Sequence, residues 1–181
     1  SAGCRVAVWP CPLDWAQDTQ ALEECLRRVM AAAALLGVGS YKLSPWIPTA
    51  GLPETVPAEV GEKLGALATT AATLGVTLLL ENHPAAHWCT AARCREILSA
   101  VEHPALRLAF NPAHFAQVGE KPFLSTWNRG TLKKYVSQLM IADGCGRRGW
   151  PAYTPPAQGQ GEVKELMSIL RCRSFDGLFT L

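Results

Sequence analysis

The feature of this sequence that most restricts its fold is a regular alternation of short apolar runs with longer amphipathic segments. The apolar runs have the composition of buried strands. They are 5–9, 40–43, 76–80, 106–110, 138–142 and 176–181. Their starts lie 30 to 38 residues apart, which is about the length of one strand–helix unit. Strands that alternate with helices in this way pair in parallel, so the pattern predicts an α/β fold with six parallel strands.

The segments between these runs carry the signals of helices. Asp18 is a good helix N-cap, and the apolar residues after it recur at helical spacing until Gly37 ends the pattern. Gly75 ends a second helix in the same way, and Thr90 caps a third. The predicted helices are 19–36, 58–74, 90–101, 130–137 and 161–172. Because no interdomain linker interrupts the alternation, we expect a single domain over residues 1–181.

Composition narrows the class of protein. Hydrophobic residues make up 49% of the chain and charged residues 18%, against about 25% charged in typical soluble proteins. Disorder requires the opposite balance and is excluded. The net charge is only +2, so the chain lacks the basic field of a nucleic-acid-binding protein, and we expect no nucleic-acid partner.

Signals for a membrane and for an oxidising compartment are weak. The longest uncharged run, residues 64–80, has 17 residues and includes four threonines and two glycines. A membrane-spanning helix needs about 20 mostly apolar residues, so a buried helix, a turn and a strand explain this run better. The seven cysteines include no Cys-x-x-Cys pair, which favours reduced thiols and a cytoplasmic location.

Polar side chains follow three consecutive predicted strands at the point where each strand ends. These are Glu81-Asn82-His83, then Asn111 and His114, then Asp143 with Arg147 shortly after it. The carboxyl ends of parallel strands meet at one face, where parallel barrels build their sites, so we predict a shared polar pocket. The alternative is that Glu81 and Asp143 only cap the loops that follow them.

Two tryptophans near strand ends are further candidates for ligand binding. Trp9 ends the first predicted strand, and Trp46 follows the second. Aromatic rings at such positions stack on sugar rings, although packing in the core or in loops explains them equally well. We predict both as substrate-binding residues, with packing as the open alternative.

Five segments of the chain resemble one family, in that family's order. They are GVTLLLENH (75–83), LRLAFNPAHF (106–115), YVSQLMIADG (135–144), GQGEVKELMSIL (159–170) and FDGLFTL (175–181). The family is the xylose isomerase-like superfamily, which includes sugar-phosphate isomerases and epimerases and the endonuclease IV type of nuclease. The resemblance covers essentially the whole chain and implies a TIM-type barrel.

The family holds a divalent cation (Mn, Mg or Zn) with two Glu, one Asp and one His, and this sequence matches that set poorly. The first ligand Glu matches Glu81, but the ligand Asp falls on Asn111 and the ligand His on Met140. The last Glu would follow Leu181. His114 matches the family's Asp-x-x-His partner. The resemblance therefore implies at most a weak site for a divalent cation at Glu81, Asn111 and His114.

The resemblance implies a sugar or sugar-phosphate isomerase or epimerase that transfers a proton through an enediolate. The implied catalytic residues are Glu81 and His114. The residues expected to bind substrate are His83, Asn111, Asp143, Arg147, Trp9 and Trp46. A non-catalytic barrel that binds a carbohydrate or a partner is the alternative, and an endonuclease IV-like nuclease fits worst because the chain has four histidines and little net charge.

Length gives the last expectation. A complete barrel of eight units takes about 250 residues, whereas this chain has 181. The shortfall is about two strand–helix units, and the resemblance places it before residues 5–9. We therefore expect an incomplete barrel with two open sheet edges, which favour association with another copy of the chain.

Overall fold

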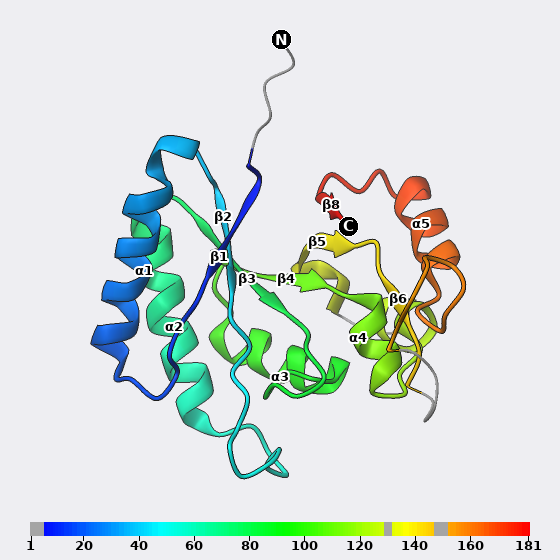
Figure 1. The fold of residues 1–181 in the computed structure, drawn as a ribbon, viewed down its shortest axis with the longest axis horizontal. Helices are drawn as coiled ribbons and strands as arrows, with labels where there is room; N and C mark the ends of the chain where they lie inside the picture. The colour runs from blue at the N-terminus through cyan, green and yellow to red at the C-terminus, as the bar shows by residue number, and fades with distance from the viewer. Residues whose placement is uncertain (1–5, 129–131, 147–151) are drawn as a thin grey trace.

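The computed structural model describes residues 6–128, 132–146 and 152–181, and its centre is a parallel sheet of six strands (Figure 1). The six strands lie side by side in the order in which they occur along the chain. They are β1 (Val8–Cys11), β2 (Ser40–Leu43), β3 (Thr77–Glu81), β4 (Leu106–Phe110), β5 (Val136–Met140) and β8 (Leu178–Thr180). The predicted parallel α/β sheet is confirmed.

The sheet curls into part of a barrel and does not close. β1 and β8 form its two edges, and no further strand joins them within the described residues. The predicted incomplete TIM-type barrel is therefore confirmed. β1 begins three residues later than predicted and includes Pro10. An edge strand tolerates proline because the N–H that proline lacks would have no neighbouring strand to bond on the open side.

Four of the five predicted helices are present with small shifts at their ends. They are α1 (Thr19–Ala33), α2 (Ala58–Thr73), α3 (Ala91–Val101) and α5 (Val163–Cys172). α1 packs on α2 and α2 on α3, and Figure 1 shows α1 and α2 on one flank of the molecule and α5 on the other. No helix within the described residues is long and apolar enough to cross a membrane.

The predicted helix over 130–137 is wrong. The chain there forms a 3-10 turn, η3 (Leu132–Tyr135), and β5 begins at the next residue. The crossover between β4 and β5 instead uses a short helix, α4 (Pro112–Gln117), and a π-helical segment, η2 (Pro122–Asn128). α4 starts directly after β4 because the Asn111 side chain caps its first turn and Pro112 occupies a position that needs no N–H donor.

Side chains alternate along each strand between a face toward the helices and a face toward the barrel interior. The helix-facing side is apolar and fully buried, and each large aliphatic residue contributes about 1.5–3 kcal/mol through burial. Its members include Tyr41, Leu78, Leu80, Leu108, Phe110 and Leu139. The opposite face carries Lys42 and Glu81 beside the open interior, so the sheet that forms the core also exposes a polar surface.

Candidate functional site

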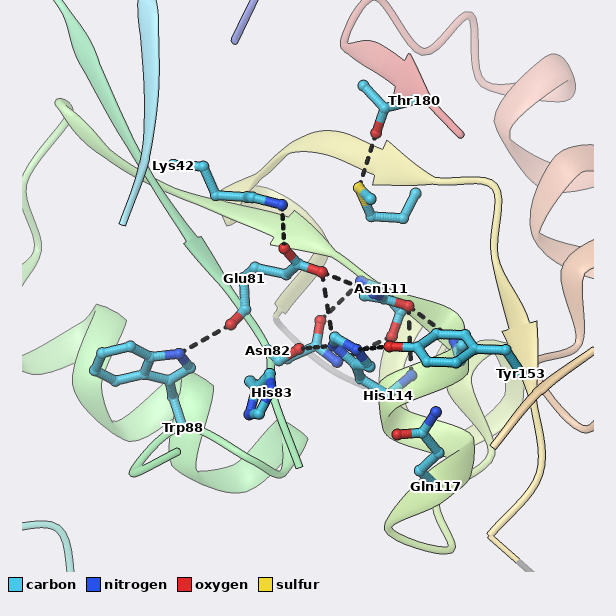
Figure 2. A network of polar contacts seen from close by, with 12 residues as sticks. Lys42, Glu81, Asn82, His83, Trp88, Asn111, His114, Gln117, Tyr153 and Thr180 are labelled. Carbon is cyan, nitrogen blue, oxygen red and sulfur yellow. Dashed lines mark hydrogen bonds and ion pairs between the residues drawn. The ribbon is translucent and has the colours of Figure 1, made fainter. Parts of the chain in front are cut away.

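Glu81 is the last residue of β3, and its carboxylate lies between a cation and an amide donor (Figure 2). Its Oε2 is 2.8 Å from Nζ of Lys42, and its Oε1 accepts a hydrogen bond of 2.7 Å from Nδ2 of Asn111. Only 14% of the Glu81 side chain is exposed. The Nε1 of Trp88 also donates to the main-chain carbonyl of Glu81 at 2.9 Å, which anchors the end of the strand. The carboxylate is thus held in one orientation.

Asn82 holds the ends of β3 and β4 together. This residue is fully buried, and its Nδ2 donates to the main-chain carbonyl of Asn111 at 2.9 Å. The main-chain N–H of Asn111 in turn donates to Oδ1 of Asn82 at 2.7 Å. Because both backbone groups of Asn111 pair with one side chain, the position of Asn111 relative to Glu81 is set by Asn82.

His114 lies in α4, and both of its ring nitrogens have partners. Nδ1 is 2.6 Å from the main-chain carbonyl of Asn82, and Nε2 is 2.6 Å from the hydroxyl of Tyr153. A carbonyl oxygen only accepts, so Nδ1 carries a proton and donates it. In the neutral ring, Nε2 then accepts the hydrogen bond from Tyr153. Nδ1 also lies 3.6 Å from Oε1 of Glu81, which brings the imidazole beside the carboxylate.

Tyr153 reaches His114 from a separate two-stranded sheet formed by β6 (Asp143–Gly144) and β7 (Tyr153–Thr154). The side chain of Gln117 donates to the carbonyl of Ala152 at 2.8 Å, which fastens β7 to α4. Tyr153 as a whole is 57% exposed. Its hydroxyl therefore links a residue that is open to solvent with the buried imidazole of His114.

Asp143 organises the loop that carries Tyr153. Its carboxylate is buried and accepts hydrogen bonds from the main-chain N–H groups of Gly144 (2.8 Å), Gly159 (3.0 Å) and Gly161 (2.7 Å). Both oxygens are thereby used within the protein. This geometry favours a structural role for Asp143, which positions the loop. It is less suited to the substrate contact that the sequence predicted.

His83 follows the same strand as Glu81, and its ring centroid lies 5.2 Å from that of His114. Burial lowers the pKa of His83, and the nearby His114 lowers it further, while the carboxylate of Glu81 opposes both effects. The neutral imidazole is therefore favoured at neutral pH.

A cavity of about 320 Å³ opens in front of Glu81. This volume is at the lower end of the usual range for ligand pockets. Its lining includes Pro10, Cys11, Lys42, Ser44, Glu81 and His83. Burial, with a smaller effect of Cys25, raises the pKa of Cys11 to about 12, so this thiol stays protonated and is a poor nucleophile. The reactive groups of the cavity are therefore Lys42, Glu81 and the imidazole of His83.

The structure brings Glu81, His83, Asn111 and His114 together, as the strand ends predicted, but it does not bring the two tryptophans to this cavity. Trp9 pairs with Tyr41 on the helix-facing side of the sheet and packs against the core. Trp46 stacks on Trp15 with ring centroids 5.0 Å apart, and it lines a separate groove. Arg147 lies outside the described residues.

Two residues of the site, Lys42 and Tyr153, were not among those predicted from the sequence, and Asn82 was expected in the polar pocket without an assigned role. Lys42 did carry a signal, because it alternates with Tyr41 and Leu43 in a short strand and so faces the barrel interior. Tyr153 had no such signal, since it lies 39 residues from His114 in a segment without helical or strand periodicity.

The residues present do not fit a divalent cation. Both oxygens of Glu81 are already paired, and Oδ1 of Asn111 accepts from the N–H of Ala113 at 3.1 Å, so Asn111 turns a donor rather than an oxygen toward Glu81. Sδ of Met140 accepts a contact of 2.8 Å from the hydroxyl of Thr180. In the part of the chain that the structure describes, no three His, Cys, Asp or Glu residues form a group that could hold a metal ion. Hard cations need several converging oxygens, which this arrangement lacks.

Comparisons with known proteins identify the fold. A family model described as xylose isomerase-like TIM barrel matches residues 1–181, which confirms the resemblance seen in the sequence. The probable 3-DHS dehydratase AsbF from Bacillus anthracis has a TM-score of 0.80 and 15% identity, covering 98% of this chain and 69% of that one. A sequence search of curated proteins gives no match.

Two further solved structures are similar over almost the whole chain. A D-tagatose 3-epimerase-like protein has a TM-score of 0.71 and 20% identity, covering 96% of this chain and 68% of its own. The IolI protein, whose structure holds a zinc atom, has a TM-score of 0.71 and 18% identity, and the match covers 97% of this chain and 66% of the IolI chain. At these identities the likeness shows the fold alone, and this chain spans about two thirds of the length of each structure.

Proposed function

This chain belongs to the xylose isomerase-like TIM barrel family, and we propose that it acts on a sugar or sugar phosphate as an isomerase or epimerase. The observation that carries the proposal is the carboxylate of Glu81, held at the end of β3 in front of a cavity of about 320 Å³. The similarity to a D-tagatose 3-epimerase-like protein supports a sugar as the substrate.

In the proposed reaction, Glu81 accepts a proton from the carbon beside the substrate carbonyl. The electron pair of the C–H bond forms a C=C bond, and the π electrons of the carbonyl move to its oxygen, giving an enediolate. Transfer of one proton between the two oxygens and return of the proton from Glu81 to the neighbouring carbon complete an isomerisation. No oxidant or reductant is consumed.

The remaining polar groups orient the substrate in this proposal. His83 and Lys42 line the cavity and offer hydrogen bonds to sugar hydroxyls. Asn111 holds Glu81 through a hydrogen bond, and His114 lies beside the carboxylate. Substrate binding by Arg147 and a cytoplasmic location stay predictions from the sequence. No step is assigned to a divalent cation, because the donor groups do not fit one.

Replacement of Glu81 by Gln tests the assignment. Incorporation of deuterium from D₂O at the carbon next to the carbonyl is followed by NMR with D-fructose, D-tagatose and D-allulose. Loss of the base is expected to lower the exchange rate about 10²–10⁴-fold. Glu165→Gln, on the exposed face of α5, is the matched control and should keep the wild-type rate. Exchange that persists unchanged in Glu81→Gln would refute the assignment.

A second candidate function is a non-catalytic barrel that binds a carbohydrate or a partner. The observation that favours it is that Asn111 and Met140 stand where the family resemblance expects metal ligands. The amide oxygen of Asn111 and the sulfur of Met140 are both engaged in contacts within the protein. Saturation-transfer NMR separates the two functions, because a non-catalytic barrel would bind one of these sugars without any deuterium incorporation. The small net charge of +2 gives no support to a nuclease.

We also propose that the open edges of the sheet mediate self-association. β1 and β8 each lack a second neighbour within the described residues. Unpaired strand edges and exposed apolar side chains favour pairing with another chain.

A further inference from the structure

We propose that the ammonium group of Lys42 takes the place of a divalent cation in this site and binds the carbonyl oxygen of a sugar in the cavity beside Glu81. This inference rests on the isomerase or epimerase function proposed above. It assigns a substrate-binding and catalytic role to a strand residue, and it makes the chemistry of the site independent of a metal ion.

The position of Lys42 is the first support. Its Nζ lies 2.8 Å from Oε2 of Glu81, and this carboxylate is 14% exposed (Figure 2). A positive charge so close to a largely buried carboxylate balances its charge and opposes the binding of a second cation at the same oxygen. Lys42 reaches this position because β2 pairs with β3 in a register that puts Lys42 beside Leu79, two residues before Glu81 on the same face.

The orientation of Asn111 is the second support. Its Oδ1 accepts from the N–H of Ala113 at 3.1 Å, which caps α4. Its Nδ2 therefore faces Oε1 of Glu81 at 2.7 Å. Both oxygens of Glu81 thus receive N–H donors, one of them charged, where a metal site would gather further oxygens. The donors of Lys42 and Asn111 therefore complement the charge of the Glu81 carboxylate.

The cavity gives Lys42 access to a ligand. Lys42 and Glu81 both line the space of about 320 Å³, and 35% of the Lys42 side chain is exposed. An ammonium has three N–H donors. Among the described residues Glu81 is its partner, so donors remain for a ligand oxygen.

This geometry supplies what the proposed reaction needs. When Glu81 removes the proton beside the carbonyl, negative charge develops on the carbonyl oxygen. A fixed ammonium at that oxygen stabilises the charge as it forms, and such groups typically contribute about 10²–10³-fold in rate. The proton stays on Glu81 until it returns to carbon, so Lys42 stabilises the enediolate without itself changing its protonation.

The first experiment asks whether a metal binds at Glu81, and it needs no sugar. Mn²⁺ is titrated by calorimetry into the full chain after dialysis against a chelator. We expect the wild type and Glu81→Gln to give the same titration. A site for one Mn²⁺ per chain that is present in the wild type and lost in Glu81→Gln would overturn the proposal.

The second experiment follows deuterium incorporation into D-fructose, D-tagatose and D-allulose in the presence of EDTA. We expect Lys42→Met to lower the rate about 10²–10³-fold and Lys42→Arg to retain part of it, because the arginine keeps the charge. Lys164→Met, at an exposed position of α5, should match the wild type. A wild-type rate in Lys42→Met, or a wild-type rate that appears only with Mn²⁺, would overturn the role of Lys42.

Two further results keep the outcomes distinct. Circular dichroism of Lys42→Met checks that it folds, and Lys42→Gln replaces it if it does not. If no ketose exchanges even in the wild type, the proposed function fails, while the Mn²⁺ titration still decides whether a metal belongs at Glu81.

Discussion

Nδ1 of His114 donates to the main-chain carbonyl of Asn82 at 2.6 Å, across 32 residues of sequence. The same residue, Asn82, uses its side chain to hold the backbone of Asn111. One buried amide residue therefore fixes the ends of two strands and the orientation of the imidazole. The position of Glu81 relative to its neighbours depends on this clamp, although Asn82 does not itself line the cavity.

Replacement of Asn82 by Ala should destabilise the protein. It removes two buried hydrogen bonds and leaves the N–H of Asn111 without its partner, while the carbonyl of Asn111 keeps only the 3.3 Å hydrogen bond from the N–H of Phe115. One unsatisfied buried group costs about 1–3 kcal/mol, so we expect a loss of about 1–3 kcal/mol in the free energy of unfolding. Urea denaturation measures it, with Gln20→Ala on the exposed face of α1 as the control. Equal stability of the two variants would contradict the clamp.

Replacement of Tyr153 by Phe should weaken the site without unfolding the protein. The hydroxyl bonded to Nε2 of His114 is lost, while the half-exposed ring stays. One hydrogen bond contributes about 0.5–1.5 kcal/mol, so sugar binding or turnover should fall about 3- to 10-fold. Long-range ¹H–¹⁵N NMR should show the proton of the neutral His114 ring on Nδ1 in both proteins. A proton on Nε2 in the wild type would disprove the assigned hydrogen bonds.

The loop whose N–H groups bond to Asp143 should not accommodate a side chain at Gly161. A Cβ there would lie 2.7 Å from Oδ1 of Asp143 and 3.2 Å from Cβ of Pro112. We expect Gly161→Ala to cost about 1–3 kcal/mol, the usual penalty for overpacking. In Gly65→Ala the new Cβ meets nothing within 4 Å, and the helix α2 should gain up to about 1 kcal/mol. Thermal unfolding of the two variants should therefore shift in opposite directions.

Glu120 predicts a pH dependence of stability. Partial burial raises its pKa above the ordinary value of 4.5, although the N–H of Ala91 opposes the shift. A carboxyl with a raised folded-state pKa contributes its full stability below the unfolded pKa and loses it as pH rises through the folded pKa. Glu120→Gln keeps an acceptor for Ala91 and removes the charge. We expect it to raise the melting temperature at neutral pH and to have no effect well below pH 4.5; a gain of the same size at both pH values would contradict this account.

Self-association through the sheet edges should depend on the exposed apolar side chain of β8. Phe179 in this strand is 43% exposed. We expect sedimentation velocity to show a concentration-dependent dimer in the wild type and weaker association in Phe179→Lys. Leu36→Lys, which changes an equally exposed leucine in the 3-10 turn after α1, is the control. A chain that stays monomeric at all concentrations would rule out the proposed association.

The strand ends show how much of the site could be predicted from the sequence. Glu81, Asn111 and His114 were placed together because parallel strands bring their carboxyl ends to one edge, and the structure confirms that they meet. Trp9 and Trp46 were placed there by the same argument, but the side to which each ring points depends on packing. Trp9 pairs with Tyr41 on the helix-facing side, and Trp46 stacks on Trp15.

The sequence by itself determined the positions and the parallel pairing of the six strands, since the alternation of apolar runs with helical segments is a local pattern. It also placed the carboxylate of Glu81 at a strand end. Only the tertiary structure decided which groups surround that carboxylate. The pairing of Lys42 with Glu81 depends on the register of β2 against β3, and the contact of Tyr153 with His114 depends on a loop held by Asp143. Both are contacts between distant segments, whose geometry follows from packing and hydrogen bonding that no local pattern encodes.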